Sequence, residues 1–328
     1  MNENRKFKPS TVLTHILLIA LVVINLFPLY WMTTFSLKDN DEIFGGYLRD
    51  SAGKVILDEN GERIPMERNM IGLPHTWRWY NYEKALNTGN MGRYFLNSLI
   101  VASSTILLTL IAAFMATYAL TRLVWKGRKA MNKFLMLGLT IPIHAALIPV
   151  FMILARMKLL DTYIALIVPY AAFSLSMGIL ISIGFMGDIP YDLDEAAFLD
   201  GCGVWGIFGR VIAPLMMPAT ATVGIYTFLQ CWNELLFATI FVSKGQFRTL
   251  PVGVQQLFGQ YTTDWGPIGA ALAIATIPTM IVYALLSKRI QAGFIAGAVK
   301  GSKTCIEKPF PVFREGFFAG TETGLGSV

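Results

Sequence analysis

Charged residues are scarce in this chain of 328 residues. Asp, Glu, Lys and Arg together make up 15% of it, whereas soluble domains contain roughly 25%. Hydrophobic residues make up 54%, and the mean hydropathy is +0.53. This composition excludes an ordinary water-soluble enzyme.

Cysteine and histidine are also rare, with three of each: Cys202, Cys231, Cys305, His15, His75 and His144. The cysteines fall on an expected cytoplasmic loop, within an expected helix and on the C-terminal tail, so an extracellular disulfide framework is excluded. The histidines lack metal-ligand spacing with any cysteine or carboxylate. We find no nucleophile and base at a workable spacing either, and therefore predict no catalytic residue and no metal site.

The few charges leave six long runs free of Asp, Glu, Lys and Arg: 9–37, 94–121, 134–155, 162–187, 211–233 and 265–287. Each is long enough to cross a hydrocarbon layer of roughly 30 Å, which takes about 20 helical residues. The runs are apolar nearly all round, as helices surrounded by lipid and other helices require. We predict an all-α polytopic membrane protein with six transmembrane helices.

Basic residues indicate the topology. Fifteen Lys and Arg fall on the side that holds the N-terminus and only four in the short loops opposite, so both termini should be cytoplasmic. This distribution also accounts for the net charge of +6 without a nucleic-acid partner. The predicted organisation, including the tail after the last span, is an N-terminal segment 1–10, a first helix 11–37, an extracytoplasmic segment 38–93, helices two to six over 94–288, and a cytoplasmic tail 289–328.

The extracytoplasmic segment 38–93 has two features. Asn60-Gly61 stands between short β-prone stretches and favours a hairpin with a type I′ turn. Further on are four aromatic residues, Trp77, Trp79, Tyr80 and Tyr82. Such rings settle at the level of the lipid headgroups, which favours an aromatic belt; contact with an external partner is the alternative.

The inner loop 188–214, between the fourth and fifth helices, is too structured for a simple connector. Pro190 suits the first turn of a helix, and Asp192, Asp194 and Glu195 place negative charge at its positive end. Ala196 and Ala197 would leave a low surface that another protein can approach.

The second half of this loop predicts another short helix. Gly201 supplies a bend, Trp205 and Phe208 should share one face, and Pro214 should begin the fifth transmembrane helix. A helix lying on lipid is the alternative, but such helices carry Lys and Arg. This loop has one arginine and five carboxylates between residues 188 and 200, so a protein partner is favoured.

The loop resembles the EAA loop of ABC importer permeases. In that pattern Glu-Ala-Ala is followed after three residues by Gly, and after nine more by Ile, any residue, and Leu-Pro. The matching residues are Glu195, Ala196, Ala197, Gly201 and Pro214; Val211 replaces the Ile and Ala213 the Leu.

Further stretches resemble the MalG-like subunits of carbohydrate importers, namely 95–102, 160–163, 169–170, 200–201, 232–234, 248–253, 263–266 and 297–301. Two features depart from the family: the segment after the first helix is longer than usual, and 27 residues follow Gly301.

The resemblance implies a permease subunit in a bacterial or archaeal cytoplasmic (inner) membrane. It implies four kinds of partner: a second permease subunit, two ATPase subunits, an extracytoplasmic sugar-binding protein and the lipid bilayer. No cofactor is expected in this chain, because ATP and Mg²⁺ would be bound by the ATPase. The residues expected to couple the chain to the ATPase are Glu195, Ala196, Ala197, Asp200, Gly201, Trp205, Phe208 and Pro214.

Sugars are bound by hydrogen bonds and aromatic faces, so polar groups on apolar helices are candidates for the substrate pathway. They are Asn25, Gln230, Trp232, Asn233 and Glu234. Glu234 is an ionisable group on a membrane helix, which by default faces a cavity or a partner; near the outer end of its helix it could instead be hydrated. A secondary transporter or channel working without an ATPase is the alternative function, although only Glu234 would serve as its intramembrane carboxylate.

Overall fold

The structure is a computed structural model that describes residues 9–50, 54–258 and 263–300, with side chains from residue 13 to 285 within those ranges. The first eight residues of the predicted N-terminal segment and the tail beyond residue 300 lie outside the described residues. The chain forms two compact units: Met1–Arg93 with Val252–Pro278, and Tyr94–Pro251 with Thr279–Val328. Helices α4, α13 and α14 run through the boundaries between the units.

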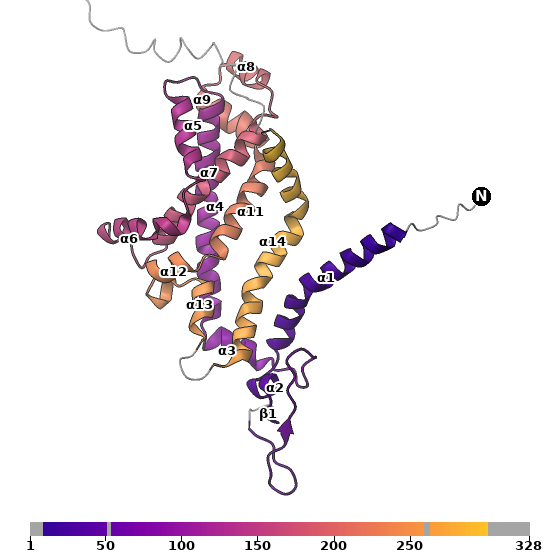
Figure 1. Ribbon diagram of the computed structural model, residues 1–328. Coiled ribbons are helices and arrows are strands. Elements are labelled where there is room, and N and C mark those ends of the chain that lie inside the picture. Colours follow the sequence, from indigo (N-terminus) through magenta and orange to yellow (C-terminus); the bar gives the residue numbers. More distant parts are fainter. Residues whose placement is uncertain (1–8, 51–53, 259–262, 301–328) are drawn as a thin grey trace, which may run out of the picture. The chain divides into compact units, whose positions relative to one another are not determined.

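The first unit begins with the long helix α1, Pro9–Phe35. It is followed by α2 (Asn40–Phe44), strands β1 (Gly46–Tyr47) and β2 (Pro65–Met66), which pair antiparallel, and helix α3 (Tyr80–Asn87). The span Leu13–Phe35 of α1 is apolar, and its most hydrophobic stretch contains no buried residue, whereas Thr34 and Phe35 at its end are buried. Figure 1 shows α1 leaving the rest of its unit as a single extended helix. Its 27 residues reach about 40 Å at 1.5 Å each, enough to cross the hydrocarbon layer.

Polar side chains fix the chain just after α1. The buried amide of Asn81 donates to the carbonyl oxygens of Ser36, at 2.9 Å, and Lys38, at 2.8 Å. The fully buried Lys38 ammonium donates to the carbonyls of Asn69, at 2.8 Å, and Gly72, at 2.7 Å. These bonds satisfy carbonyl groups of irregular backbone that no helix or strand pairs. They attach the segment after β2 to the end of α1.

The turn at Asn60-Gly61 differs from the predicted type. Leu57 pairs with Arg63 in an antiparallel bridge, and the Gly61 N–H donates to the Asp58 carbonyl at 3.0 Å. Only Gly61 has a positive φ, +82°, whereas a type I′ turn requires positive φ at both central residues. Asp58 explains the difference, because its carboxylate accepts from the N–H groups of Asn60, at 2.9 Å, and Glu62, at 2.8 Å, which stabilises a wider loop.

The second unit contains three helices that run side by side: α4 (Met91–Thr121), α7 (Ile164–Met186) and α11 (Met217–Trp232) (Figure 1). The remaining helical segments of the second unit are α5 (Arg128–Leu137), η1 (Ile143–Ala146), α6 (Leu147–Arg156), α8 (Asp192–Leu199), α9 (Val204–Ile207), η2 (Phe208–Ile212), α10 (Ala213–Leu215), α12 (Leu236–Phe241) and η3 (Gly245–Phe247). Two more helices belong to both units: α13 (Leu250–Gln256) and α14 (Trp265–Lys300). At Gly178 an added Cβ would lie 3.2 Å from Ala113 and 3.4 Å from Val223, so small residues allow close packing of these helices.

Among the described residues, four helices are long and apolar enough to cross a membrane: Leu13–Phe35, Met91–Thr121, Ile164–Met186 and Trp265–Leu285. A fifth span is counted if Val204–Leu215 and Met217–Trp232 are taken together, although they meet at 74°. The protein is therefore mostly helical and carries several apolar spans, as predicted.

The charge-free run 134–155 does not form one continuous helix. Helix α5 ends at Leu137, the chain is extended at Pro142 (ψ 121°), and the next α-helix begins at Leu147. At the end of α5 the Leu135 carbonyl accepts both from the Gly138 N–H, at 3.2 Å, and from the Ser176 hydroxyl, at 2.7 Å. Pro142 then disfavours helical geometry in the residue before it. Composition predicted the apolar run but not this interruption.

Candidate functional site

The predicted loop 188–214 contains a short helix, α8, Asp192–Leu199. Asp192, Asp194 and Glu195 occupy its first turn, where their charges interact favourably with the positive end of the helix dipole. Helix α8 thus begins in the acidic stretch from which it was predicted.

Gly201 ends α8 in a Schellman motif. The Gly201 N–H donates to the Phe198 carbonyl at 2.9 Å, and the Cys202 N–H donates to the Ala197 carbonyl at 3.0 Å. Gly201 has φ +83°, and a Cβ added there would meet nothing within 4 Å. The requirement for glycine is therefore conformational, since left-handed backbone is costly for other residues.

The inner face of α8 carries Asp194 and Ala197, which are both buried. Ala197 packs into an apolar cluster with Phe114, Tyr118 and Ile207. The prediction that Ala197 belongs to an exposed low surface is therefore wrong: only Ala196 is exposed. The physical reason is the helical period, because residues 194 and 197 are three apart and share the face turned toward α4.

Arg122 belongs to the basic residues that were counted on the cytoplasmic side, but its side chain is not exposed. Arg122 is buried directly after α4, and its Nη1 lies 3.0 Å from the Asp194 carboxylate. Its Nη2 donates to the Ile189 carbonyl at 2.6 Å, and its guanidinium carbon lies 3.9 Å from the Tyr191 ring centroid. Burial raises the pKa of the Asp194 carboxyl, and the charge of Arg122 opposes that shift.

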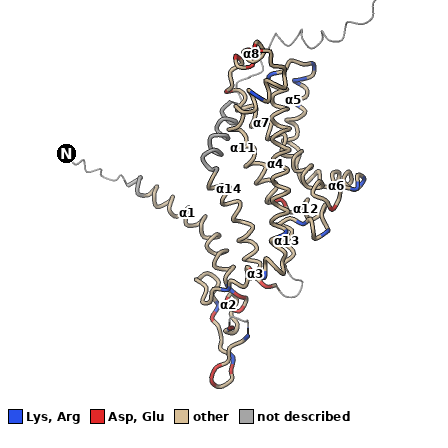
Figure 2. The backbone as a smooth tube through the Cα atoms, turned by 180° about the vertical axis from the view of Figure 1, so that it is seen from behind, with Lys and Arg blue, Asp and Glu red and all other residues tan. Residues whose placement is uncertain are grey.

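The outer face of α8 combines negative charge with apolar side chains. Glu195, Ala196 and Asp200 are exposed, Leu199 is 85% exposed and Trp205 73%. Figure 2 shows the acidic residues along α8 and basic residues in the segment that leads into α5. An exposed surface of this kind suits contact with another protein better than contact with an anionic leaflet.

Trp205 and Phe208 do not share a face, contrary to expectation. Helix α9 ends at Ile207, and Phe208 begins the wider π-helical turn η2, which rotates the side chains that follow. Phe208 packs on Tyr118, with ring centroids 5.3 Å apart, while Trp205 points outward. Pro214 is exposed in the short helix α10, before the bend at Met216, and so does not begin the long helix α11.

Two of the predicted pathway residues are held by neighbouring side chains. Trp232 is buried between Phe95, at 5.7 Å, and Phe228, at 5.1 Å between ring centroids. Glu234 stands in the break between α11 and α12, where it accepts from the N–H groups of Phe237, at 2.8 Å, and Ala238, at 3.1 Å.

Glu234 also accepts a hydrogen bond from the buried hydroxyl of Tyr170 on α7, at 2.5 Å. The carboxylate therefore caps the start of α12 and joins it to α7. Gln230 and Asn233 of the same segment are exposed. Asn25, the last predicted pathway residue, is exposed on α1 in the first unit, where its amide donates to the Leu21 carbonyl at 2.7 Å.

Three of the sequence stretches singled out above meet in the second unit. Asn97 donates to the carbonyls of Gln246, at 2.9 Å, and Arg248, at 2.8 Å, and accepts from the Tyr163 hydroxyl at 2.7 Å. The Ser98 hydroxyl accepts from the Leu250 N–H at 2.8 Å. These contacts join residues 95–102, 160–163 and 248–253, which sequence reasoning singled out without predicting that they touch.

Asp161 adds a second connection at this end of the unit. Its carboxylate accepts from the N–H groups of Ser243, at 2.7 Å, and Lys244, at 2.9 Å. These bonds, above all that from Lys244, hold the pKa of the Asp161 carboxyl below its ordinary value. The Asp161 backbone has φ +59°, a conformation that aspartate tolerates better than most residues.

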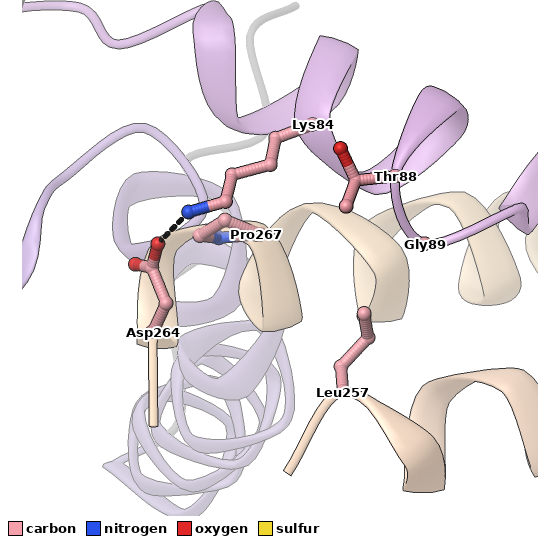
Figure 3. A pocket seen from close by; sticks show the side chains of 6 residues that line it. All are labelled: Lys84, Thr88, Gly89, Leu257, Asp264 and Pro267. Carbon is pink, nitrogen blue, oxygen red and sulfur yellow. Dashed lines mark hydrogen bonds and ion pairs between the residues drawn. The ribbon is translucent and has the colours of Figure 1, made fainter. Parts of the chain in front are cut away.

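A small pocket lies in the first unit, between α3 and the start of α14, with a volume of about 120 Å³. Lys84 and Asp264 form an ion pair across it at 2.5 Å, beside Thr88, Gly89, Leu257 and Pro267 (Figure 3). Ligand pockets usually measure roughly 300–1,000 Å³, so we assign no ligand to this one. Within the described residues, no group of three or more His, Cys, Asp and Glu side chains could hold a metal ion.

Comparison with protein families decides the identity of the chain. Residues 85–295, well over half of it, match the family described as the binding-protein-dependent transport system inner membrane component. The chain belongs to this family. The matched residues include the whole of loop 188–214 and the stretches around Asn97 and Glu234 described above.

Several relatives in this family are named as permease proteins of sugar transport systems. The trehalose/maltose transport system permease protein MalG of Thermococcus litoralis is 32% identical, over 86% of this chain and 94% of its own length. The diacetylchitobiose uptake system permease protein NgcG of Streptomyces coelicolor is 30% identical, over 91% of each chain. The sulfoquinovosyl glycerol transport system permease protein SmoH of Agrobacterium fabrum is 32% identical, over 86% of this chain and 91% of its own.

A solved structure shows the same fold. It is a chain of a bacterial ABC transporter involved in the import of the acidic polysaccharide alginate, with a TM-score of 0.71 at 18% identity, covering 88% of this chain and 99% of that one. The chain is thus a membrane-embedded permease of the ABC importer type, a transport component and not an enzyme.

Proposed function

We propose that this permease forms half of the transmembrane pathway for a carbohydrate, an oligosaccharide, and is driven by ATP through the loop 188–214. The observation that carries the proposal is the outer face of α8, where Glu195 and Ala196 lie exposed with Leu199, followed by the exposed Asp200 and, on α9, the exposed Trp205. Charged and apolar groups together give a docking surface both register and affinity. The substrate class is supported by the sugars named for the relatives.

The partners in this proposal are a second permease subunit, two ATPase subunits and an extracytoplasmic sugar-binding protein. In this proposal ATP and Mg²⁺ bind to the ATPase subunits. Movement of the ATPase pair pushes on α8, and the helices of the second unit switch between inward-facing and outward-facing arrangements.

We also propose six membrane crossings in a bacterial or archaeal inner membrane, with both termini cytoplasmic. Four described helices suffice by length and composition, the bent pair ending in α11 supplies the fifth, and the interrupted run 134–155 supplies the sixth. A broken helix can cross a membrane where neighbouring helices satisfy its free backbone groups, and the Ser176 hydroxyl already binds the Leu135 carbonyl.

The test is charge reversal on the outer face of α8. Glu195→Lys should abolish ATP-dependent sugar uptake by proteoliposomes that contain all the partner subunits, while membrane insertion is unchanged. Glu59→Lys, which reverses an equally exposed charge in the loop around Gly61, is the matched control and should transport normally. Normal uptake by Glu195→Lys, or sugar uptake by the purified chain without any other polypeptide, would refute the proposal.

A further inference from the structure

Arg122 is the point at which α4, α7 and the loop 188–214 meet. It follows α4 directly, donates to the carbonyl of Met186 at the end of α7 at 3.3 Å, and donates to Ile189 in the loop at 2.6 Å. Its second terminal nitrogen pairs with Asp194 on α8 at 3.0 Å.

Tyr191 closes the same cluster from the other side. Its ring lies against the Arg122 guanidinium, 3.9 Å from the guanidinium carbon. Its hydroxyl donates to the carbonyl of Thr121, the last residue of α4, at 3.4 Å. The position just before the first turn of α8 is therefore attached to the end of α4 independently of the ion pair.

Burial of a guanidinium costs free energy unless its positive charge is paired, because arginine stays protonated in proteins. The flat fork of the guanidinium can contact a carboxylate, carbonyl oxygens and an aromatic face at once, whereas an ammonium group cannot reproduce that geometry. Lys126, four residues along, is exposed and illustrates the ordinary state of a basic residue in this segment. The burial of Arg122 thus calls for a role beyond anchoring to lipid.

We infer that Arg122 is a positioning residue that clamps α8 to the ends of α4 and α7, so that a push on α8 moves these two helices as one body. The inference rests on the proposed function, in which α8 receives the push. Without the clamp, α8 still docks on the ATPase through its outer face, which Arg122 does not touch. Its displacement is then taken up by the loop instead of reaching α4 and α7.

The test measures sugar transported per ATP hydrolysed, in the complete importer reconstituted in proteoliposomes. Arg122→Met keeps an unbranched, flexible side chain and removes the charge and the fork, and Lys126→Met is the matched control. Arg122→Met should lower the sugar-to-ATP ratio by at least about tenfold, since a buried ion pair loses one partner. Arg122→Lys keeps the charge but not the fork and should fall between Arg122→Met and the wild type.

Two further measurements separate this inference from a general folding defect. Copurification of the ATPase with Arg122→Met and with Arg122→Lys should be unchanged, and hydrogen exchange of the α8 amides should be faster in Arg122→Met than in Lys126→Met. Asp194→Asn leaves the buried arginine without its partner and should assemble less well than Arg122→Met, in which Asp194 can take up a proton.

The inference is overturned if Arg122→Met, correctly assembled, transports as much sugar per ATP as Lys126→Met. It is also overturned if all three variants of Arg122 and Asp194 fail to assemble, because the cluster would then serve folding alone. Neither result touches the proposed function, which is tested separately by the uptake of Glu195→Lys and by uptake without the ATPase.

Discussion

Ala196 and Ala197 are neighbours in α8 with opposite environments, and substitution of each by leucine should separate packing from docking. Ala197 is 8% exposed and lies against Phe114, Tyr118 and Ile207. Leucine there adds three carbons to a filled cluster, which costs about 1–3 kcal/mol of folding free energy. Leucine at the exposed Ala196 changes the free energy of unfolding by no more than about 0.5 kcal/mol, because surface substitutions have small effects and leucine is a good helix former.

The substitution that leaves stability unchanged should impair ATPase binding and transport. Ala196→Leu should leave the unfolding temperature in detergent unchanged, yet reduce copurification of the ATPase and ATP-dependent sugar uptake, because the added side chain stands on the docking face. Ala197→Leu should lower the unfolding temperature and speed up hydrogen exchange in α8. The reasoning is refuted if Ala196→Leu binds the ATPase and transports normally, or if Ala197→Leu is as stable as the wild type.

Three further predictions concern single contacts. Gly201→Ala should lose about 1 kcal/mol of stability, because φ +83° is strained for a residue with a Cβ. Gly201→Asn should lose less, and the rates of hydrogen exchange of the α8 amides in the two variants measure the difference. Tyr170→Phe removes the donor to Glu234 and should lower the free energy of unfolding by about 1.5–3 kcal/mol, as for a hydrogen bond to a charged group. A lower unfolding temperature would show this loss, and an unchanged temperature would mean that Glu234 does not join α12 to α7. Asp161→Ala should lower the unfolding temperature more than Asp161→Asn at pH 7. Because the Asp161 pKa is depressed, the part of the difference between wild type and Asp161→Ala that depends on the charge should be complete above about pH 4 and should be lost as the pH falls from there through the lower pKa of the folded protein.

The sequence predicted long helices well wherever an apolar run was uninterrupted. The runs that became α1, α4, α7 and α14 contain too few polar groups to form anything but spans. The run 134–155 failed as a single helix because composition does not record the break between Leu137 and Leu147, where Pro142 is extended and disfavours helical geometry before it.

The candidate site was predicted in outline and missed in detail. Glycine at 201 has a local signature and was read correctly, since only the backbone decides its conformation. Arg122 and Asp194 were assigned by charge to exposed surfaces, because an ion pair between residues 72 positions apart leaves no local pattern. The pair could have been suspected from the helical spacing of Asp194 and Ala197, which places both on one face of α8.

Helix α1 has a consequence for how the protein must be handled. The end of its span contacts its own unit, because the Tyr30 hydroxyl and the Trp31 indole N–H donate to the carbonyls of Ile71, at 3.2 Å, and Met70, at 3.0 Å. Just beyond the helix, Gly269 approaches so closely that an added Cβ would lie 2.9 Å from the Ser36 Cα. The leucine, isoleucine and valine side chains between Leu13 and Leu26 are exposed, so lipid, detergent or another subunit must cover them. An isolated chain should therefore bind more detergent per polypeptide than the assembled importer does. The mass of bound detergent before and after assembly would show how much of α1 a partner subunit covers.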